Sequence, residues 1–396
     1  MSLNNTPAAE RIHIGIFGKR NAGKSSLINA ITGQNLAIVS DVKGTTTDPV
    51  LKSMELLPLG PVVLIDTPGL DDEGELGILR IQKAYQMLNK TDVAVLVVDS
   101  NIGMTKEDED ILVRIQEKEI PYLIVMNKCD LLSIEETQEN QIYVSAMQGT
   151  NIHELKELIA KKAKREEMER KIVADLLNPL DFVILVVPID SSAPKGRLIL
   201  PQQQTIRDIL DAGAVSIVVK DTELEDTLKK LSSPPALVIT DSQAFAKVSK
   251  VVPREIPLTS FSILFARYKG DLQTVANGAA VIDELEDGDI ILISEGCTHH
   301  RQCEDIGTVK LPRLIKKHTG KEVKFEFTSG TEFPSDLSPY KLIIHCGACM
   351  LNEREMKYRL KCAVDAGIPM TNYGIAIAHI TGILKRSVEP FSEIIL

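Results

Sequence analysis

The feature that most constrains this chain is the run GKRNAGKS at 18–25, which lies between a β-rich apolar stretch and a helical pattern. It matches G-x-x-x-x-G-K-[ST], whose glycines let backbone N–H groups surround a phosphate at the start of a helix. In this pattern Lys24 places a positive charge near the β- and γ-phosphates, and the Ser25 hydroxyl binds Mg²⁺. The run therefore predicts a nucleoside-triphosphate site on a strand–loop–helix unit. The residues expected around the phosphates are Gly18, Asn21, Ala22, Gly23, Lys24, Ser25 and Ser26.

Two further motifs are expected to complete the phosphate and magnesium site. Asp66-Thr67-Pro68-Gly69 ends an apolar strand, which puts the Asp66 carboxylate near Mg²⁺ and the flexible Gly69 near the γ-phosphate. Thr46 lies in the segment between these motifs and can donate a second hydroxyl to Mg²⁺. Their order along the chain is the order that a GTPase requires.

The nucleotide base is predicted from the motif Asn127-Lys128-Cys129-Asp130, which ends another apolar strand. A carboxylate at Asp130 can accept two hydrogen bonds from the guanine edge, which adenine cannot offer. Ser145 and Ala146 follow the last strand of this region and are expected to complete the base pocket. The predicted ligand is therefore GTP or GDP.

Residues 11–165 resemble the Era/TrmE-type GTPases of the translation-factor class, whose motifs stand at these positions. The resemblance implies GTP hydrolysis. Leu70 occupies the place where small GTPases carry a glutamine that orients water, and a leucine cannot do so by hydrogen bonding. Asn21 occupies the place where cation-dependent members hold K⁺, so slow, K⁺-stimulated turnover is expected; the alternative for Asn21 is an amide that stabilises the loop. The residues in catalytic roles would be Asn21, Lys24, Thr46 and Gly69.

The rest of the chain also alternates strand and helix patterns, which predicts an α/β protein with mostly parallel sheets covered by helices. Strand patterns continue after the first domain at 181–188, 214–220, 236–240, 289–294, 323–327 and 341–345. We expect three successive α/β domains, of which the first has the P-loop GTPase fold. The predicted boundaries give a GTPase domain at 1–171, a middle domain at 172–258 and a C-terminal domain at 259–396.

Composition and charge restrict the classes of partner. The net charge is −10, tryptophan is absent and no segment is basic, so nucleic acid is disfavoured as the main partner. The chain has neither an apolar run long enough to span a membrane nor a signal-peptide pattern at its start, so a cytoplasmic protein is expected. Six cysteines in 396 residues are too few for a disulfide scaffold and fit a reducing compartment.

Two cysteine motifs near the C-terminus predict a metal site. Cys297-Thr298-His299 and His345-Cys346-Gly347-Ala348-Cys349 each follow a predicted strand, so both lie where parallel sheets place their ligands. Three thiolates suit an iron–sulfur cluster or, with a histidine as fourth ligand, zinc. The histidines can ligate the metal or orient the loops, and Cys303 is either a spare thiol or an alternative ligand. Cys129 and Cys362 are read as unligated thiols.

An N-terminal GTPase domain, a middle α/β domain without a phosphate loop and a C-terminal CxH…HCxxC pair together resemble the FeFe-hydrogenase maturation GTPases. The resemblance implies a 4Fe–4S cluster held by Cys297, Cys346 and Cys349, a dimerising middle domain, and a homodimer or higher homo-oligomer. It also implies a scaffold that receives a diiron precursor from radical-SAM maturases and delivers it to the apo FeFe-hydrogenase. The alternatives are an RNA-modification or ribosome-assembly GTPase and a zinc-binding metallochaperone GTPase.

Overall fold

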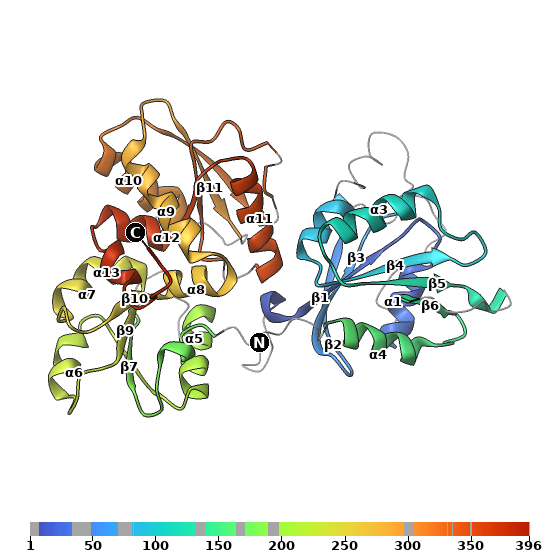
Figure 1. Ribbon diagram of the computed structural model, residues 1–396, viewed down its shortest axis with the longest axis horizontal. Helices are drawn as coiled ribbons and strands as arrows, with labels where there is room; N and C mark the ends of the chain where they lie inside the picture. Colours follow the sequence, from blue (N-terminus) through green and yellow to red (C-terminus); the bar gives the residue numbers. More distant parts are fainter. Residues whose placement is uncertain are drawn as a thin grey trace. The chain divides into compact units, whose positions relative to one another are not determined.

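The computed structural model describes residues 8–33, 49–69, 81, 83–131, 139–163, 171–188, 198–296, 305–330, 332–334, 336–348 and 351–395. The chain divides into two compact units, Met1–Met168 and Glu169–Leu396, each built from β-sheet and helices (Figure 1). The predicted α/β class is confirmed. Within the described residues, no helix is both long enough and apolar enough to cross a membrane.

The first unit is a six-stranded sheet in the order β2-β3-β1-β4-β5-β6. Among the described strands of this sheet, β2 and β3 pair antiparallel and the other neighbours pair in parallel. The strands are β1 (Ile12–Phe17), β2 (Val50–Leu56), β3 (Gly60–Asp66), β4 (Val93–Asp99), β5 (Tyr122–Asn127) and β6 (Gln141–Val144). The helices are α1 (Lys24–Thr32), α3 (Lys106–Glu117) and α4 (Ile152–Ala163).

Helices cover both faces of this sheet, and β4 explains why. Its side chains alternate between two apolar cores: Val93, Val95 and Val97 join the core under α1 and α4, whereas Ala94, Leu96 and Val98 join the core under α3. A strand buried on both faces must be apolar at nearly every position, as β4 is. The mostly parallel arrangement brings the ends of β1, β3, β4 and β5 to one edge of the sheet.

The second unit contains two four-stranded sheets, ordered β10-β9-β7-β8 and β12-β11-β13-β14, and every pair is parallel. The strands are β7 (Phe182–Val186), β8 (Val215–Val219), β9 (Leu237–Thr240), β10 (Leu258–Ser260), β11 (Ile290–Glu295), β12 (Lys324–Ser329), β13 (Leu342–His345) and β14 (Met370–Asn372). The α-helices are α5 (Leu200–Asp211), α6 (Leu224–Lys230), α7 (Phe245–Val251), α8 (Phe261–Lys269), α9 (Leu272–Gly278), α10 (Leu311–Thr319), α11 (Glu353–Asp365), α12 (Tyr373–Ile380) and α13 (Leu384–Val388).

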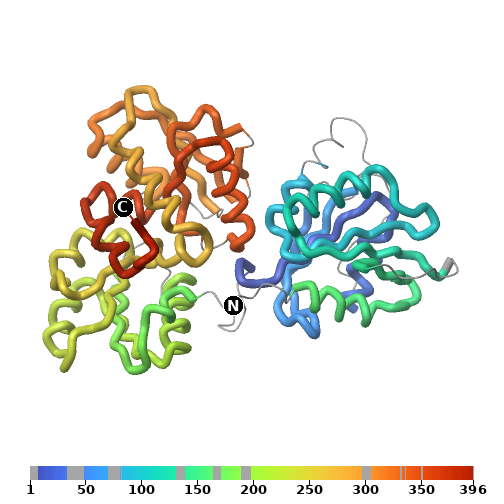
Figure 2. The backbone as a smooth tube through the Cα atoms, viewed as in Figure 1, coloured from blue at the N-terminus to red at the C-terminus, as the bar shows by residue number. Residues whose placement is uncertain are grey.

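One apolar core runs through both sheets of the second unit. It joins Val183 and Ile239 of the first sheet to Leu292 and Ile343 of the second, with Leu264 of α8 in the same cluster. A smaller core lies on the other face of the second sheet. Figure 2 traces the backbone through these elements. The boundary that we predict after residue 258 falls inside β10, and the three-domain division stays a prediction.

Candidate functional site

The phosphate loop connects β1 to α1, and its glycines are required by close backbone contacts. A Cβ atom on Gly18, whose φ is 141°, would lie 2.2 Å from the Val97 carbonyl oxygen of β4. A Cβ atom on Gly23, whose φ is 92°, would lie 2.2 Å from Nδ2 of Asn127. Asn21, the residue predicted to hold K⁺, is exposed and also left-handed, with φ 60°.

The remaining side chains of the loop lie at the start of α1. The Lys24 ammonium donates hydrogen bonds to the carbonyl oxygens of Gly18 (2.8 Å) and Lys19 (2.7 Å), so the loop curls around it. Ser25 and Ser26 lie in the first turn of α1, where backbone N–H groups lack partners within the helix. The N-terminus of a helix attracts anions, so this arrangement suits a phosphate group.

The buried amide of Asn127 joins three of the predicted motifs. Its Nδ2 donates to the carbonyl oxygen of Ala22 (3.0 Å), and its Oδ1 accepts from the backbone N–H of Ala146 (3.1 Å). Only 2% of Asn127 is exposed, so water does not compete for these bonds. Asn127 therefore positions the phosphate loop against the predicted base pocket.

The residues around the predicted base pocket are held by a further ion pair that the motifs did not predict. Lys128, with φ 67°, donates a hydrogen bond of 2.6 Å to Asp99 at the end of β4. Burial raises the pKa of Asp99, but hydrogen bonds from Lys128 and Asn101 outweigh this effect and hold the pKa below its usual value. Asp130 is exposed, as a residue that binds a base must be, and Ser145 is fully buried.

Asp66 lies at the end of β3, next to Ile16 of β1 in register. Burial raises its pKa, and the positive charges of Lys24 and Lys52 oppose the rise. The following residue, Thr67, donates from Oγ1 to the Ile16 carbonyl oxygen (2.7 Å), which fixes the start of the loop that leads to Gly69. The Asp66 carboxylate thus lies at the edge of the sheet from which the phosphate loop starts, where it could hold a magnesium ion. Thr46 and Leu70 lie outside the described residues.

The second predicted site lies in the other unit, where β11 and β13 are adjacent. Ser294 pairs with His345, and Cys346 then donates its backbone N–H to the Ser294 carbonyl oxygen (3.0 Å). The backbone N–H of Gly296 donates to Sγ of Cys346 (3.1 Å). Gly296 immediately precedes Cys297 in the sequence, so this contact joins Cys346 to the last described residue before the first cysteine motif. Cys297, His299, Cys303 and Cys349 lie outside the described residues.

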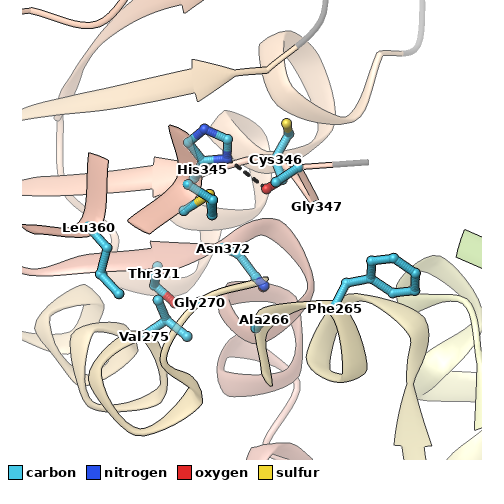
Figure 3. Close-up of a pocket in the computed structure, with 12 residues that line it drawn as sticks. Phe265, Ala266, Gly270, Val275, His345, Cys346, Gly347, Leu360, Thr371 and Asn372 are labelled. Carbon is cyan, nitrogen blue, oxygen red and sulfur yellow. Dashed lines mark hydrogen bonds between the residues drawn. The ribbon is translucent and has the colours of Figure 1, made fainter. Parts of the chain in front are cut away.

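His345 is fully buried, and both of its ring nitrogens have protein partners. Nδ1 lies 2.8 Å from the Cys346 carbonyl oxygen, so it carries the proton, and Nε2 accepts from Nη1 of Arg359 (3.1 Å; Figure 3 shows the Nδ1 contact). A ring engaged on both sides orients the Cys346 loop. Of the two roles left open by the sequence, this geometry favours the orienting one.

Arg359 of α11 is fully buried, and all five of its N–H groups have acceptors. Nε and Nη2 donate to Glu355 (3.0 and 2.9 Å), and Nη2 also donates to the Gly330 carbonyl oxygen (2.8 Å). Nη1 donates to Ser294 and to His345, each at 3.1 Å. This network supports the loop that carries Cys346.

A second buried cation holds the other side of that loop. Lys269 of α8 is 3% exposed and donates to the carbonyl oxygens of Ala348 (3.1 Å) and Leu351 (2.9 Å). These two acceptors flank Cys349 in the sequence. A small pocket next to the loop is lined by residues of α8, β13 and β14, among them Phe265, Cys346 and Asn372 (Figure 3). Neither Lys269 nor Arg359 was predicted, because no motif marks them.

Comparison with known protein families decides the family of the chain. Residues 172–270 match the hydrogen maturase F dimerization domain, and residues 273–390 match the hydrogen maturase F tetramerization domain. The chain belongs to the hydrogen maturase F family. The first unit of this hydrogen maturase F member is a GTPase domain, because residues 13–128 match the family described as 50S ribosome-binding GTPase.

Curated relatives of the chain are GTPases. The tRNA modification GTPase MnmE of Nitrosomonas eutropha is 38% identical over 161 residues, which are 38% of this chain and 35% of that protein. GTPase Der of Wolinella succinogenes is 35% identical over 43% of this chain and 39% of its own length. The chain thus spans little more than a third of these relatives. Among solved structures, Aquifex aeolicus Era bound to GDP and AlF4⁻ is 21% identical, with a TM-score of 0.35 over 52% of this chain and 92% of that one.

Proposed function

We propose that this protein is a GTP-hydrolysing iron–sulfur scaffold that receives a diiron precursor and delivers it to apo FeFe-hydrogenase. The observation that supports the proposal is the 3.1 Å contact between Gly296 N–H and Cys346 Sγ within a member of the hydrogen maturase F family, since Gly296 immediately precedes Cys297 in the sequence. Radical-SAM maturases would supply the precursor. The sparse cysteines fit a reducing compartment such as the cytoplasm.

In the GTPase domain, the backbone and Lys24 would bind the β- and γ-phosphates, and Ser25, Thr46 and Asp66 would hold Mg²⁺ directly or through water. Gly69 would approach the γ-phosphate, and Asp130 would accept the guanine N–H groups. The two hydrogen bonds of the Asn127 amide support these roles, because they connect the phosphate loop at Ala22 to the segment that contains Ala146. Asp130→Ala should abolish the preference for GTP over ATP, measured as competition for a fluorescent GDP analogue. Equal binding of ATP and GTP by the wild type would contradict the assignment.

Asn21 would hold a potassium ion that offsets charge developing on the γ-phosphate. Its support is local: the residue is exposed on the phosphate loop in a left-handed conformation. GTP turnover should be slow, and it should be faster in K⁺ than in Na⁺ at equal ionic strength. Asn21→Ala should remove the difference. Equal rates of the wild type in both salts would refute the potassium site.

In the C-terminal segment, Cys297, Cys346 and Cys349 would hold a 4Fe–4S cluster. The donor set fits, because the described Cys346 is only half-buried and its sulfur accepts an N–H hydrogen bond of the kind that tunes cluster potentials. Two buried side chains, Lys269 and Arg359, support the Cys346 segment through hydrogen bonds to Ala348 and His345. When bound, the cluster would supply iron coordination for the cargo. With three thiolates its fourth iron would be open to an external ligand.

The cluster is tested on protein purified without oxygen, by iron per chain, the EPR spectrum of the reduced protein, and activation of apo-hydrogenase. Cys346→Ser should lose most of the iron and all activation, while GTP hydrolysis stays near the wild-type rate. The matched control is Cys362→Ser on α11, which should keep all three properties. A colourless protein with stoichiometric zinc would favour the metallochaperone instead. An unchanged iron content in Cys346→Ser would refute the ligand assignment.

The middle segment would join two copies of the chain, since it matches a family dimerization domain. β8 is an edge strand that pairs only with β7, and two of its valines are exposed, Val215 at 37% and Val218 at 44%. An edge strand with apolar side chains is a template for pairing with another strand. The partner is a second copy of this chain.

The interface is tested by light scattering after size-exclusion chromatography. Val218→Lys should reduce the mass to that of a smaller assembly, because it puts a charge on the paired edge. Val113→Lys, at a residue that is 50% exposed on α3, is the control and should leave the mass unchanged. An unchanged mass for Val218→Lys would refute pairing through β8.

A further inference from the structure

Three side chains from three separate elements meet in the second unit. Asp283 lies in the 3₁₀ helix Ala279–Glu284, His318 in α10 and His379 in α12. Nε2 of His318 is 2.7 Å from Oδ1 of Asp283, and Nε2 of His379 is 2.9 Å from Oδ2. The imidazoles thus approach one carboxylate from two helices, one at each oxygen. One atom of each residue lies within 4.8 Å of the others.

The topology separates this cluster from Cys346. α10 begins after the loop that follows the carboxyl end of β11, and it ends at Thr319, five residues before β12 begins at Lys324. α12 follows β14 directly and ends at Ile380. Since helices that follow parallel strands return to the opposite edge of the sheet, the cluster lies at the edge far from Cys346.

The local electrostatics favour a cation at this point. His318 and His379 both lie in the last turn of their helices, where the helix dipole is negative. The side chains of Asp283, His318 and His379 are 57%, 30% and 19% exposed, so an ion can enter and keep bound water.

The distances are also close to those of a metal site. Zinc binds nitrogen and oxygen at about 2.0–2.2 Å, so two ligands of a tetrahedral ion lie roughly 3.4 Å apart. The nitrogen–oxygen distances of 2.7 and 2.9 Å must therefore open by only about 0.5–0.7 Å. Two imidazoles and one carboxylate form a recurrent ligand set for zinc and other first-row divalent ions.

We propose that Asp283, His318 and His379 bind a divalent first-row transition-metal ion, with water in the remaining positions. The site is distinct from the Mg²⁺ site of the GTPase domain, which offers only oxygen ligands, and from the cysteine site, which offers sulfur. It would bridge α10, α12 and the 3₁₀ helix, so the bound ion would also stabilise the second unit.

The test compares zinc bound per chain by the full-length wild type and by a His318→Asn/His379→Asn variant, after dialysis against Zn²⁺ with excess Mg²⁺. The wild type should bind one equivalent of zinc more than the double variant. Its affinity for zinc at this site should be more than about tenfold higher than that of His318→Asn or His379→Asn alone. His153→Asn is the control, because this exposed histidine lies on α4 in the other unit. Cobalt gives a second readout: the variant should lose d–d absorption while sulfur-to-cobalt charge transfer stays unchanged.

Equal zinc binding and equal cobalt spectra in the wild type and the double variant would refute the site. A second test uses the wild type alone, so it remains valid if the double variant does not fold. Zinc should protect His318 and His379 from modification by diethyl pyrocarbonate, mapped by mass spectrometry, and leave His153 reactive. Unprotected His318 and His379 at saturating zinc would likewise refute the proposal, even if the cysteine site binds iron as proposed above.

Discussion

Replacing Arg359 with methionine tests whether the buried network is what holds the cysteine loop. Arg359 is fully buried, and the side chain of its ion-pair partner Glu355 is only 4% exposed. Methionine keeps much of the apolar volume but removes all five hydrogen-bond donors. The Glu355 carboxylate is then left in the core without its positive partner, and Nε2 of His345 loses the donor that holds the ring.

The expected destabilisation is about 3–5 kcal/mol, the usual effect of removing one partner of a buried pair. Converted at about 1.4 kcal/mol per factor of ten, this raises the population of the locally open state by roughly a hundredfold to a few thousandfold. A Glu355→Gln/Arg359→Met variant should recover part of this loss, because a neutral amide is much less costly to bury than an unpaired charge.

The assay is amide hydrogen exchange of peptides from α11, followed by mass spectrometry. Lys357→Met is a matched control: this residue lies on the same helix and also pairs with a glutamate four positions earlier, Glu353 at 2.6 Å, but both side chains are more than 40% exposed. An exposed pair contributes at most about 1 kcal/mol, so exchange in the control should rise less than about fivefold. Similar exchange in Arg359→Met and Lys357→Met would refute the reasoning.

Three further outcomes follow from contacts in both units. Gly18→Ala should weaken binding of a fluorescent GDP analogue and destabilise the fold by about 1–3 kcal/mol, because the new Cβ atom meets a backbone carbonyl of β4. At Gly33 the new Cβ atom meets open space, so Gly33→Ala should change GDP binding little. Asn127→Ala removes two buried hydrogen bonds and should reduce thermal stability by about 1–3 kcal/mol and weaken GDP binding. A hydrogen bond from Arg267 lowers the pKa of Asp175 in the folded protein. The ionised Asp175 therefore stabilises the fold above the ordinary aspartate pKa, and this stabilisation is lost as the pH falls through the lower folded pKa. The free energy of unfolding in urea should differ between Asp175→Asn and the wild type near pH 7, and the two should converge in acid.

The parts of the fold that the sequence predicted are those with a strong periodic signal. The apolar runs at 289–294 and 341–345 have such a signal, and the structure confirms parallel strands there, β11 and β13. β2 was not predicted, because an antiparallel edge strand with mostly exposed side chains has no such run. β10 and β14 have three residues each, too few for a period to be read.

The site was predictable only as far as its motifs extend. Lys24 and Asp66 occupy motif positions, and the structure puts both at the same edge of the sheet. Arg359, by contrast, stands in a helix rich in charge, where its sequence indicates a solvated side chain. Its burial depends on acceptors from 294, 330 and 345, which only the folded chain brings together. The spacing of residues along the sequence does not predict partners that lie so far apart in the chain.

The apolar core shared by the two sheets of the second unit has a consequence for how such proteins can recombine. Segments 172–270 and 273–390 correspond to separate family domains, yet Val183 and Ile343 belong to one core. In a chimaera that takes one segment from each of two relatives, the core side chains of one segment would pack against core side chains with which they did not evolve. Overpacking or voids in this shared core typically cost about 1–5 kcal/mol of stability. The two segments should therefore be inherited and exchanged as a pair.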